Sequence, residues 1–312
     1  MGLKCGIVGL TNSGKTTMFN CISNTKAAVT EFAYSTNKSN IGVCAVPDDR
    51  LAKINTFIQA DKLVYANLDL VDIPGLAKGA SQGEGIGNSF LADVRLCDAL
   101  IHVLRCFDNP ALPHVEGSVD PVRDIEIVDF ELQCKDLEQV DRKISKVEKA
   151  AKIGDKNAKH DYEVLKKYKE HLEKFQNVRT LEVTPDEHAV VADMMLLTEK
   201  PVLFVCNVND DDAVTGNAYS EAVKKYVEEN GGEMLVIAAK IEIAELESED
   251  DRKVFLEDVG LTEPGVNKVI RAAYKMLDLI SFFTVGGKEN RAWTIKRGML
   301  APQAAGVIHS DL

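Results

Sequence analysis

Several features that would place a protein in a membrane or outside the cell are missing from these 312 residues. No apolar run approaches the ~20 residues needed to cross a bilayer, so we expect no transmembrane segment and no membrane partner. The N-terminus runs directly into an apolar segment and lacks the successive regions of a signal peptide. These absences predict a soluble protein of the cytoplasm.

Paired cysteines are missing as well. The seven cysteines are scattered along the chain and form no Cys-x-x-Cys pair. This spacing argues against a disulfide framework and against a structural zinc site. Most of the cysteines lie in apolar runs, where we expect them to be small core residues.

Basic residues are in the minority, with 37 Lys and Arg against 49 Asp and Glu and a formal net charge of −12. A globally acidic chain is a poor general binder of nucleic acids or anionic membranes, and we expect no DNA partner. A local basic surface remains compatible with this composition. We expect the protein to be a monomer.

Strand-like and helix-like segments alternate over most of the chain. Apolar runs at 3–8, 64–71, 99–104, 201–208 and 235–239 are typical of buried strands, and amphipathic segments lie between several of them. Such alternation predicts an α/β fold with a mainly parallel sheet and helices on both faces. We assign residues 1–130 and 200–280 to this domain.

A different pattern occupies residues 131–199. Apolar residues recur at spacings of three and four on both sides of a polar turn at 154–157, which predicts an antiparallel coiled-coil arm inserted in the α/β domain. Residues 135–174 contain twelve basic and nine acidic side chains, so this part carries +3 and the remainder −15. After residue 281, two β-like runs surround a Gly-Gly turn. We interpret residues 281–312 as a small β-rich domain that is incomplete at Leu312.

A glycine-rich motif follows the first predicted strand. Residues 9–16 read Gly-x-x-x-x-Gly-Lys-Thr and lead into a predicted helix. The glycines allow backbone N–H groups to surround a phosphate, and the helix N-terminus adds a favourable dipole. We expect Lys15 to bridge the β- and γ-phosphates of a nucleotide and the Thr16 hydroxyl to bind Mg²⁺. The motif therefore predicts a nucleoside triphosphate site.

A second element of the phosphate site is predicted at the end of a neighbouring strand. Asp72 follows the apolar run 64–71 and begins an Asp-x-x-Gly pattern that ends at Gly75. This pattern resembles the γ-phosphate-sensing switch of small GTPase-like NTPases, so we expect Asp72 to hold the Mg²⁺ shell. Thr36, in the preceding polar loop, is the candidate switch threonine for the same ion.

The predicted base site departs from the GTPase pattern Asn-Lys-x-Asp. Residues 207–210 read Asn-Val-Asn-Asp, so Val208 replaces the lysine whose stem flanks the base. Guanine specificity depends on a carboxylate held in a defined place, here Asp210. The replacement at Val208 changes the framework that would hold this carboxylate. The motif permits adenine and leaves guanine as an alternative.

With these motifs the chain resembles the Obg-like ATPase family, also called the YchF family of P-loop NTPases (TRAFAC class). The resemblance covers essentially the whole chain. The segments that carry it are 4–16, 71–76, 79–88, 114–121, 291–295 and 301–306.

The resemblance implies a G-domain-like NTPase, a coiled-coil arm and a β-grasp (TGS) domain. It further implies Mg²⁺-dependent hydrolysis of ATP and association with ribosomes or ribosomal RNA in translation or stress control. Carried over by motif, the residues expected to bind nucleotide are Asn12, Ser13, Gly14, Lys15, Thr16, Thr17, Gly75, Asn207, Val208, Asp210 and Ala239, and those expected to bind Mg²⁺ are Thr16, Thr36 and Asp72. Asn12 also matches an asparagine that helps bind K⁺ in related NTPases.

Two departures affect the expected chemistry. The switch loop 31–40 lacks the two prolines that the family usually has. Leu76 stands where many GTPases have a water-orienting glutamine, so we expect slow hydrolysis that needs another group. Lys15 and His114 are the catalytic candidates, and His114 is expected to swing in from its loop. The alternatives are a GTPase of the Obg class and a non-enzymatic, nucleotide-gated ribosome-binding protein.

Overall fold

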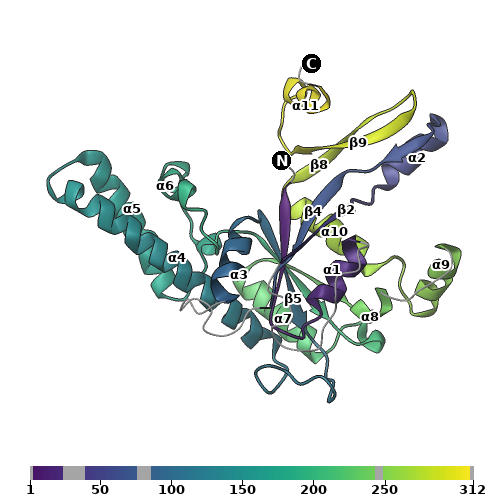
Figure 1. The fold of residues 1–312 in the computed structure, drawn as a ribbon, viewed down its shortest axis with the longest axis horizontal. Coiled ribbons are helices and arrows are strands. Elements are labelled where there is room, and N and C mark those ends of the chain that lie inside the picture. The colour runs from purple at the N-terminus through teal and green to yellow at the C-terminus, as the bar shows by residue number, and fades with distance from the viewer. Residues whose placement is uncertain (1–2, 24–38, 76–85, 243–248, 310–312) are drawn as a thin grey trace.

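The computed structural model describes residues 3–23, 39–75, 86–242 and 249–309, and its centre is a six-stranded sheet (Figure 1). The strands lie in the order β2-β4-β1-β5-β6-β7, parallel except for the pairing of edge strand β2 with β4. Their bounds are β1 Lys4–Val8, β2 Asn40–Ala45, β4 Asn67–Asp72, β5 Ala99–Arg105, β6 Val202–Asn207 and β7 Glu233–Ile237. The predicted α/β fold with a mainly parallel sheet is confirmed.

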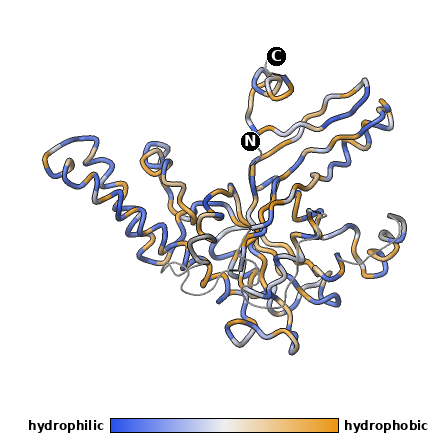
Figure 2. Tube along the Cα trace, in the orientation of Figure 1, coloured by the Kyte–Doolittle hydropathy of each residue, from blue (hydrophilic) through white to orange (hydrophobic). Residues whose placement is uncertain are grey.

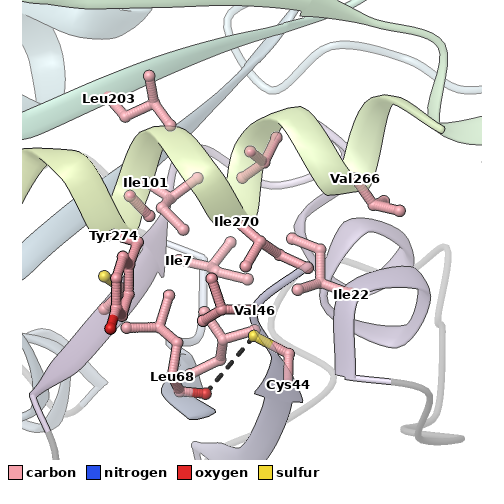
Figure 3. Close-up of a cluster of buried hydrophobic side chains, with 14 of the residues drawn as sticks. Ile7, Ile22, Cys44, Val46, Leu68, Ile101, Leu203, Val266, Ile270 and Tyr274 are labelled. Carbon is pink, nitrogen blue, oxygen red and sulfur yellow. Dashed lines mark hydrogen bonds between the residues drawn. The ribbon is translucent and has the colours of Figure 1, made fainter. Parts of the chain in front are cut away.

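Helices cover both faces of this sheet, as the continuous burial of β5 and β6 requires. On one face, α1 (Lys15–Ser23) and α10 (Gly265–Met276) pack against inward side chains of β1, β4 and β5, and Figure 3 shows part of this core. On the other face lie α3 (Ile86–Arg95), α7 (Ala218–Asn230) and the first turns of α4. Two short helices, α8 (Ala239–Glu242) and α9 (Glu249–Asp258), follow β7.

A helical arm projects from one side of the molecule, and many of its residues are hydrophilic (Figures 1 and 2). It consists of the long helix α4 (Pro121–Lys152), α5 (Lys156–Glu173) and α6 (Pro185–Val191), with 3₁₀ turns at Val178–Thr180 and Ala192–Met194. Side chains between these helices form a separate small core. Because α4 begins at Pro121, the arm boundary predicted at residue 131 falls inside one continuous helix whose start belongs to the sheet domain.

A second, three-stranded sheet has the order β3-β9-β8 and combines segments far apart in the chain. The hairpin β8 (Leu279–Thr284) and β9 (Glu289–Lys296) turns at two glycines with positive φ. Its third strand is β3 (Lys62–Val64), which follows α2 (Asp49–Phe57) and runs parallel to β9. Helix α11 (Ala301–Ile308) comes after the hairpin. The β-rich C-terminal segment therefore shares a sheet with residues from the N-terminal third of the chain.

Two observations concern the cysteines and the possibility of a membrane-spanning helix. All seven cysteines are free thiols. Within the described ranges, no helix combines the length and apolarity needed to cross a bilayer.

Candidate nucleotide-binding site

The glycine-rich loop between β1 and α1 lies at the carboxyl edge in the middle of the sheet. Gly9 (φ +145°) and Gly14 (φ +100°) adopt backbone conformations that residues with a Cβ rarely take. A Cβ at Gly9 would lie 2.4 Å from the Val103 carbonyl oxygen, and one at Gly14 would lie 2.4 Å from Asn207 Nδ2. The loop is therefore fixed by close contacts with β5 and β6, and it leads into the N-terminus of α1, where backbone N–H groups favour an anion.

Lys15 is buried in this loop. Its Nζ donates a hydrogen bond to the Leu10 carbonyl oxygen, 2.7 Å away. Burial lowers the pKa of Lys15 to about 8, and the negative charge of Asp72 acts in the opposite direction. An ammonium group without a full counter-charge favours a phosphate, which would supply the interaction that burial removes.

Thr16 and Asp72, both predicted to serve Mg²⁺, lie within hydrogen-bond distance of each other. Thr16 Oγ1 donates to Asp72 Oδ2 over 3.1 Å, and Asn40 Nδ2 approaches the same oxygen at 3.5 Å. Burial raises the pKa of the Asp72 carboxyl, and the charge of Lys15 opposes this rise. A hydroxyl and a carboxylate are hard oxygen donors of the kind Mg²⁺ prefers, so the residues fit that ion. The contribution of Asn40 was missed from sequence, because nothing in its spacing connects it with Asp72.

Gly75, the glycine of the Asp-x-x-Gly pattern, lies close to Lys15 and the phosphate loop. A Cβ at Gly75 would lie 3.2 Å from Lys15 Nζ and 3.1 Å from Thr11 Oγ1. The absence of a side chain at Gly75 thus lets its backbone approach the place where Lys15 would meet a phosphate.

The other predicted phosphate-binding residues surround the loop in different ways. Asn12 has φ +65°, and its Nδ2 donates to the Pro113 carbonyl oxygen over 3.4 Å. Ser13 is buried, and its hydroxyl has no hydrogen-bond partner among the described residues. Thr17 is half-buried on α1. Thr36 and Leu76 lie outside the described residues.

Asn207 connects the phosphate loop with the base-side loop. Its Nδ2 donates to the Ser13 carbonyl oxygen at 3.0 Å, and its Oδ1 accepts from the Ala239 backbone N–H at 3.1 Å. Val208 is buried, and its N–H donates to the Ile237 carbonyl oxygen at 2.9 Å. Both amide atoms of Asn207 are thus engaged within the protein, a positioning role that the sequence motif alone did not reveal.

Asp210 stands at the surface beside Lys240. The Asp210 carboxylate is 44% exposed, and its Oδ2 lies 3.6 Å from Nζ of Lys240, which is 82% exposed. The carboxylate at the guanine-reading position of the motif is therefore accessible and is accompanied by a positive charge.

His114 is buried in a pair with a carboxylate that the sequence did not single out. His114 Nε2 lies 2.9 Å from Asp124 Oδ2, and each side chain is 3% exposed. His114 Nδ1 accepts from the Glu116 backbone N–H at 3.1 Å. The structure therefore holds the ring away from solvent, and the predicted catalytic role requires it to leave this position. No spacing rule links residues 114 and 124, because the contact depends on how the loop folds back on α4.

Comparison with known proteins decides the family. The model described as 50S ribosome-binding GTPase matches residues 4–167, and the model of the YchF GTPase C-terminal domain, described as a protein of unknown function, matches residues 279–312. The Ribosome-binding ATPase YchF of Bacillus subtilis is 43% identical over 315 residues, with 100% of this chain and 86% of that protein covered. This chain belongs to the YchF family.

Further YchF proteins give the same result. The Escherichia coli O157:H7 protein named Ribosome-binding ATPase YchF is 43% identical over 313 residues, with 100% of this chain and 86% of that protein covered. The solved structure of the Schizosaccharomyces pombe YchF GTPase superposes with a TM-score of 0.84 at 34% identity, covering 99% of this chain and 85% of that chain. The resemblance seen in the sequence motifs is confirmed, and the fold of this chain is the YchF fold.

Proposed function

We propose that this YchF-family chain is an Mg²⁺-dependent ATP hydrolase that acts as a slow nucleotide switch on ribosomes in the cytoplasm. The observation that carries the proposal is the cluster of Lys15, Thr16 and Asp72 at the carboxyl edge of the sheet, where the phosphate loop opens. The relatives named ribosome-binding ATPases, at 43% identity, support both the reaction and the partner.

The residues of the site suggest how the reaction is assisted. Hydrolysis transfers the γ-phosphoryl group to water and releases ADP and phosphate. Lys15 would hold negative charge on the phosphates. Thr16 and Asp72 would hold Mg²⁺, which supplies charge neutralisation at the phosphate oxygens. The side chain of Leu76 cannot orient water, which supports a slow intrinsic rate.

Adenine is the preferred base in this proposal. Val208 replaces the lysine that flanks guanine in the usual motif, and its side chain is buried. GTP is the second candidate, because the accessible Asp210 carboxylate is retained and the matched model and the fission yeast structure are both named as GTPases.

Two finer elements complete the proposal. Asn12 would contribute to a K⁺ site beside the phosphates, by its match to potassium-dependent NTPases. The arm would contact ribosomal RNA, supported by the net charge of +3 over residues 135–174 in an otherwise acidic chain. We propose that the protein acts as a monomer and binds no DNA.

The decisive experiment compares wild type with Lys15→Ala. Phosphate release from Mg-ATP and Mg-GTP would be measured in K⁺ or Na⁺, with and without ribosomes. We expect a loss of about 10²–10³-fold for Lys15→Ala, by analogy with removing one preorganised charge-stabilising group. Lys53→Ala, which changes an exposed lysine on α2, is the matched control and should retain full activity.

The outcomes separate the candidates. Tighter binding and faster hydrolysis of ATP support the proposal, whereas selective use of GTP would establish the second candidate. Equal phosphate release by wild type and Lys15→Ala would instead indicate a non-enzymatic, nucleotide-gated protein.

A further inference from the structure

The buried pair of His114 and Asp124 defines a single protonation pattern. A backbone N–H can donate only to an unprotonated ring nitrogen, so His114 Nδ1, which accepts from Glu116, carries no proton. The proton of the neutral imidazole is then on Nε2, where it is donated to Asp124 Oδ2 at 2.9 Å. Both ring nitrogens are occupied, and the ring can give no hydrogen bond to a substrate in this position.

Burial raises the pKa of the Asp124 carboxyl, and Arg123 opposes this rise independently of His114. Arg123 Nη2 lies 3.2 Å from Asp124 Oδ1, and Arg123 also binds Ser118 through Nη1 and Nη2. The buried Arg105 interacts electrostatically with Asp124 from the end of β5, next to the Cys106 thiol. If His114 departs, Asp124 therefore keeps a charged partner, which lowers the penalty of leaving a carboxylate buried.

The loop that carries His114 is attached to the phosphate loop. The Pro113 carbonyl oxygen, one residue before His114, accepts from Asn12 Nδ2 at 3.4 Å. Asn12 holds a left-handed backbone conformation (φ +65°) within the phosphate loop. A change at Asn12 when a nucleotide binds would reach His114 through one residue.

We propose that Asp124 is a positioning residue that holds His114 in a retracted position, and that nucleotide hydrolysis requires the loop to release this pair. The inference rests on the proposed ATP hydrolase function and explains how a buried histidine serves it. Most molecules are then in the retracted state, and the slow rate of hydrolysis reflects the small population in which His114 has left Asp124. A partner that favours the released loop would accelerate hydrolysis without supplying a catalytic group of its own.

Asp124→Asn tests the proposal, because it removes the charge while keeping the size of the side chain. Single-turnover hydrolysis of Mg-ATP without ribosomes should rise about fivefold, the factor that corresponds to losing about 1 kcal/mol of a buried charged hydrogen bond. The rise should vanish in the double variant with His114→Ala. Asp120→Asn is the matched control, since Asp120 caps the same helix through Arg123 N and an asparagine retains the cap.

Several outcomes would overturn the proposal. An equal effect of Asp124→Asn and Asp120→Asn, or of Asp124→Asn with and without His114, would show a purely structural role. A slower rate that depends on His114 would show that Asp124 supports the productive position instead of the retracted one.

A measurement on the wild-type protein keeps the proposal testable if Asp124→Asn does not fold. Long-range ¹H–¹⁵N NMR of histidine-labelled protein, assigned with His114→Ala, should show the Nε2–H form of His114 without nucleotide. Addition of Mg-ADP with aluminium fluoride should change this signal. An unchanged signal, or a different starting tautomer, would refute the retracted pair.

The NMR measurement distinguishes failure of the retracted pair from failure of the proposed hydrolase function. If wild type and Lys15→Ala release phosphate equally, the hydrolase function fails. The tautomer of His114 and its response to the nucleotide analogue still show whether the pair exists and opens.

Discussion

The phosphate loop and the tip of the arm each contain a glycine with nearly the same backbone angle, but in opposite surroundings. Gly14 has φ +100° and Gly154 has φ +99°. A Cβ at Gly14 would lie 2.4 Å from Asn207 Nδ2, whereas a Cβ at Gly154 would meet nothing within 4 Å. The nucleotide site is thus determined by contacts between distant segments, while the arm turn is determined by local conformation.

The largest effect is expected from Gly14→Ala. The added methyl group would strain the backbone and displace Asn207, which joins the phosphate loop to Ala239. We expect a loss of about 3 kcal/mol or more in the free energy of unfolding, together with loss of measurable nucleotide binding. Calorimetric unfolding and nucleotide titration would measure both.

Gly154→Ala is the matched variant in the arm. Gly154 has nearly the same φ as Gly14 but open space around it, so only the penalty of the left-handed backbone applies. We expect the free energy of unfolding to decrease by about 1–2 kcal/mol and nucleotide binding to stay intact. Equal losses of binding in the two variants would contradict the distinction between the two regions.

An effect confined to the arm is expected from Leu165→Ala. Leu165 is fully buried in the separate core of the arm. Its truncation should destabilise the arm by about 2–5 kcal/mol, measured as faster amide hydrogen exchange in α4 and α5. Ile153→Ala, at a side chain that is 86% exposed, is the control. A parallel loss of ATP affinity in Leu165→Ala would show that the arm core and the nucleotide site are coupled.

A further effect concerns pH and the junction of the two regions. Asp136 on α4 accepts hydrogen bonds from Leu197 N and from Thr198 N and Oγ1, and burial raises the pKa of its carboxyl to about 6. Between the unfolded value near 3.8 and this value the folded state binds more protons, so the free energy of unfolding should decrease as pH rises through this window.

Asp136→Asn removes that titration. Its denaturant midpoint should change less between pH 4 and 6 than that of wild type, whatever its absolute stability. An unchanged pH slope would show that Asp136 does not titrate in this range.

The parts of the site that depend on local sequence were predictable. The glycine-rich loop has its spacing, its strand and its helix within about twenty residues, and Asp72 could be found because it ends an apolar run. The fold class followed from the same alternation of strands and helices, since period and burial are properties of short segments.

The remaining parts depend on contacts between segments distant in the chain. Asn207 was expected to bind the base, yet its engagement with Ser13 and Ala239 appears only once β6 lies beside the phosphate loop. Asp124 lies in the first turn of α4, and its pairing with His114 exists only because the preceding loop folds back on that helix. Strand β3 has three residues, too few for a recognisable period, and it exists because β9 pairs with it.

The sheet that joins β3 to β9 has a consequence for the order of synthesis. Asn290 on β9 donates to Asn55 on α2, a contact that spans 235 residues. When β3 leaves the ribosome, its partner strand has not yet been made, so its edge stays unpaired until residues 289–296 have been synthesised. The nascent chain can assemble its phosphate-loop region and arm beforehand, whereas the small sheet can form only after β9 has been made.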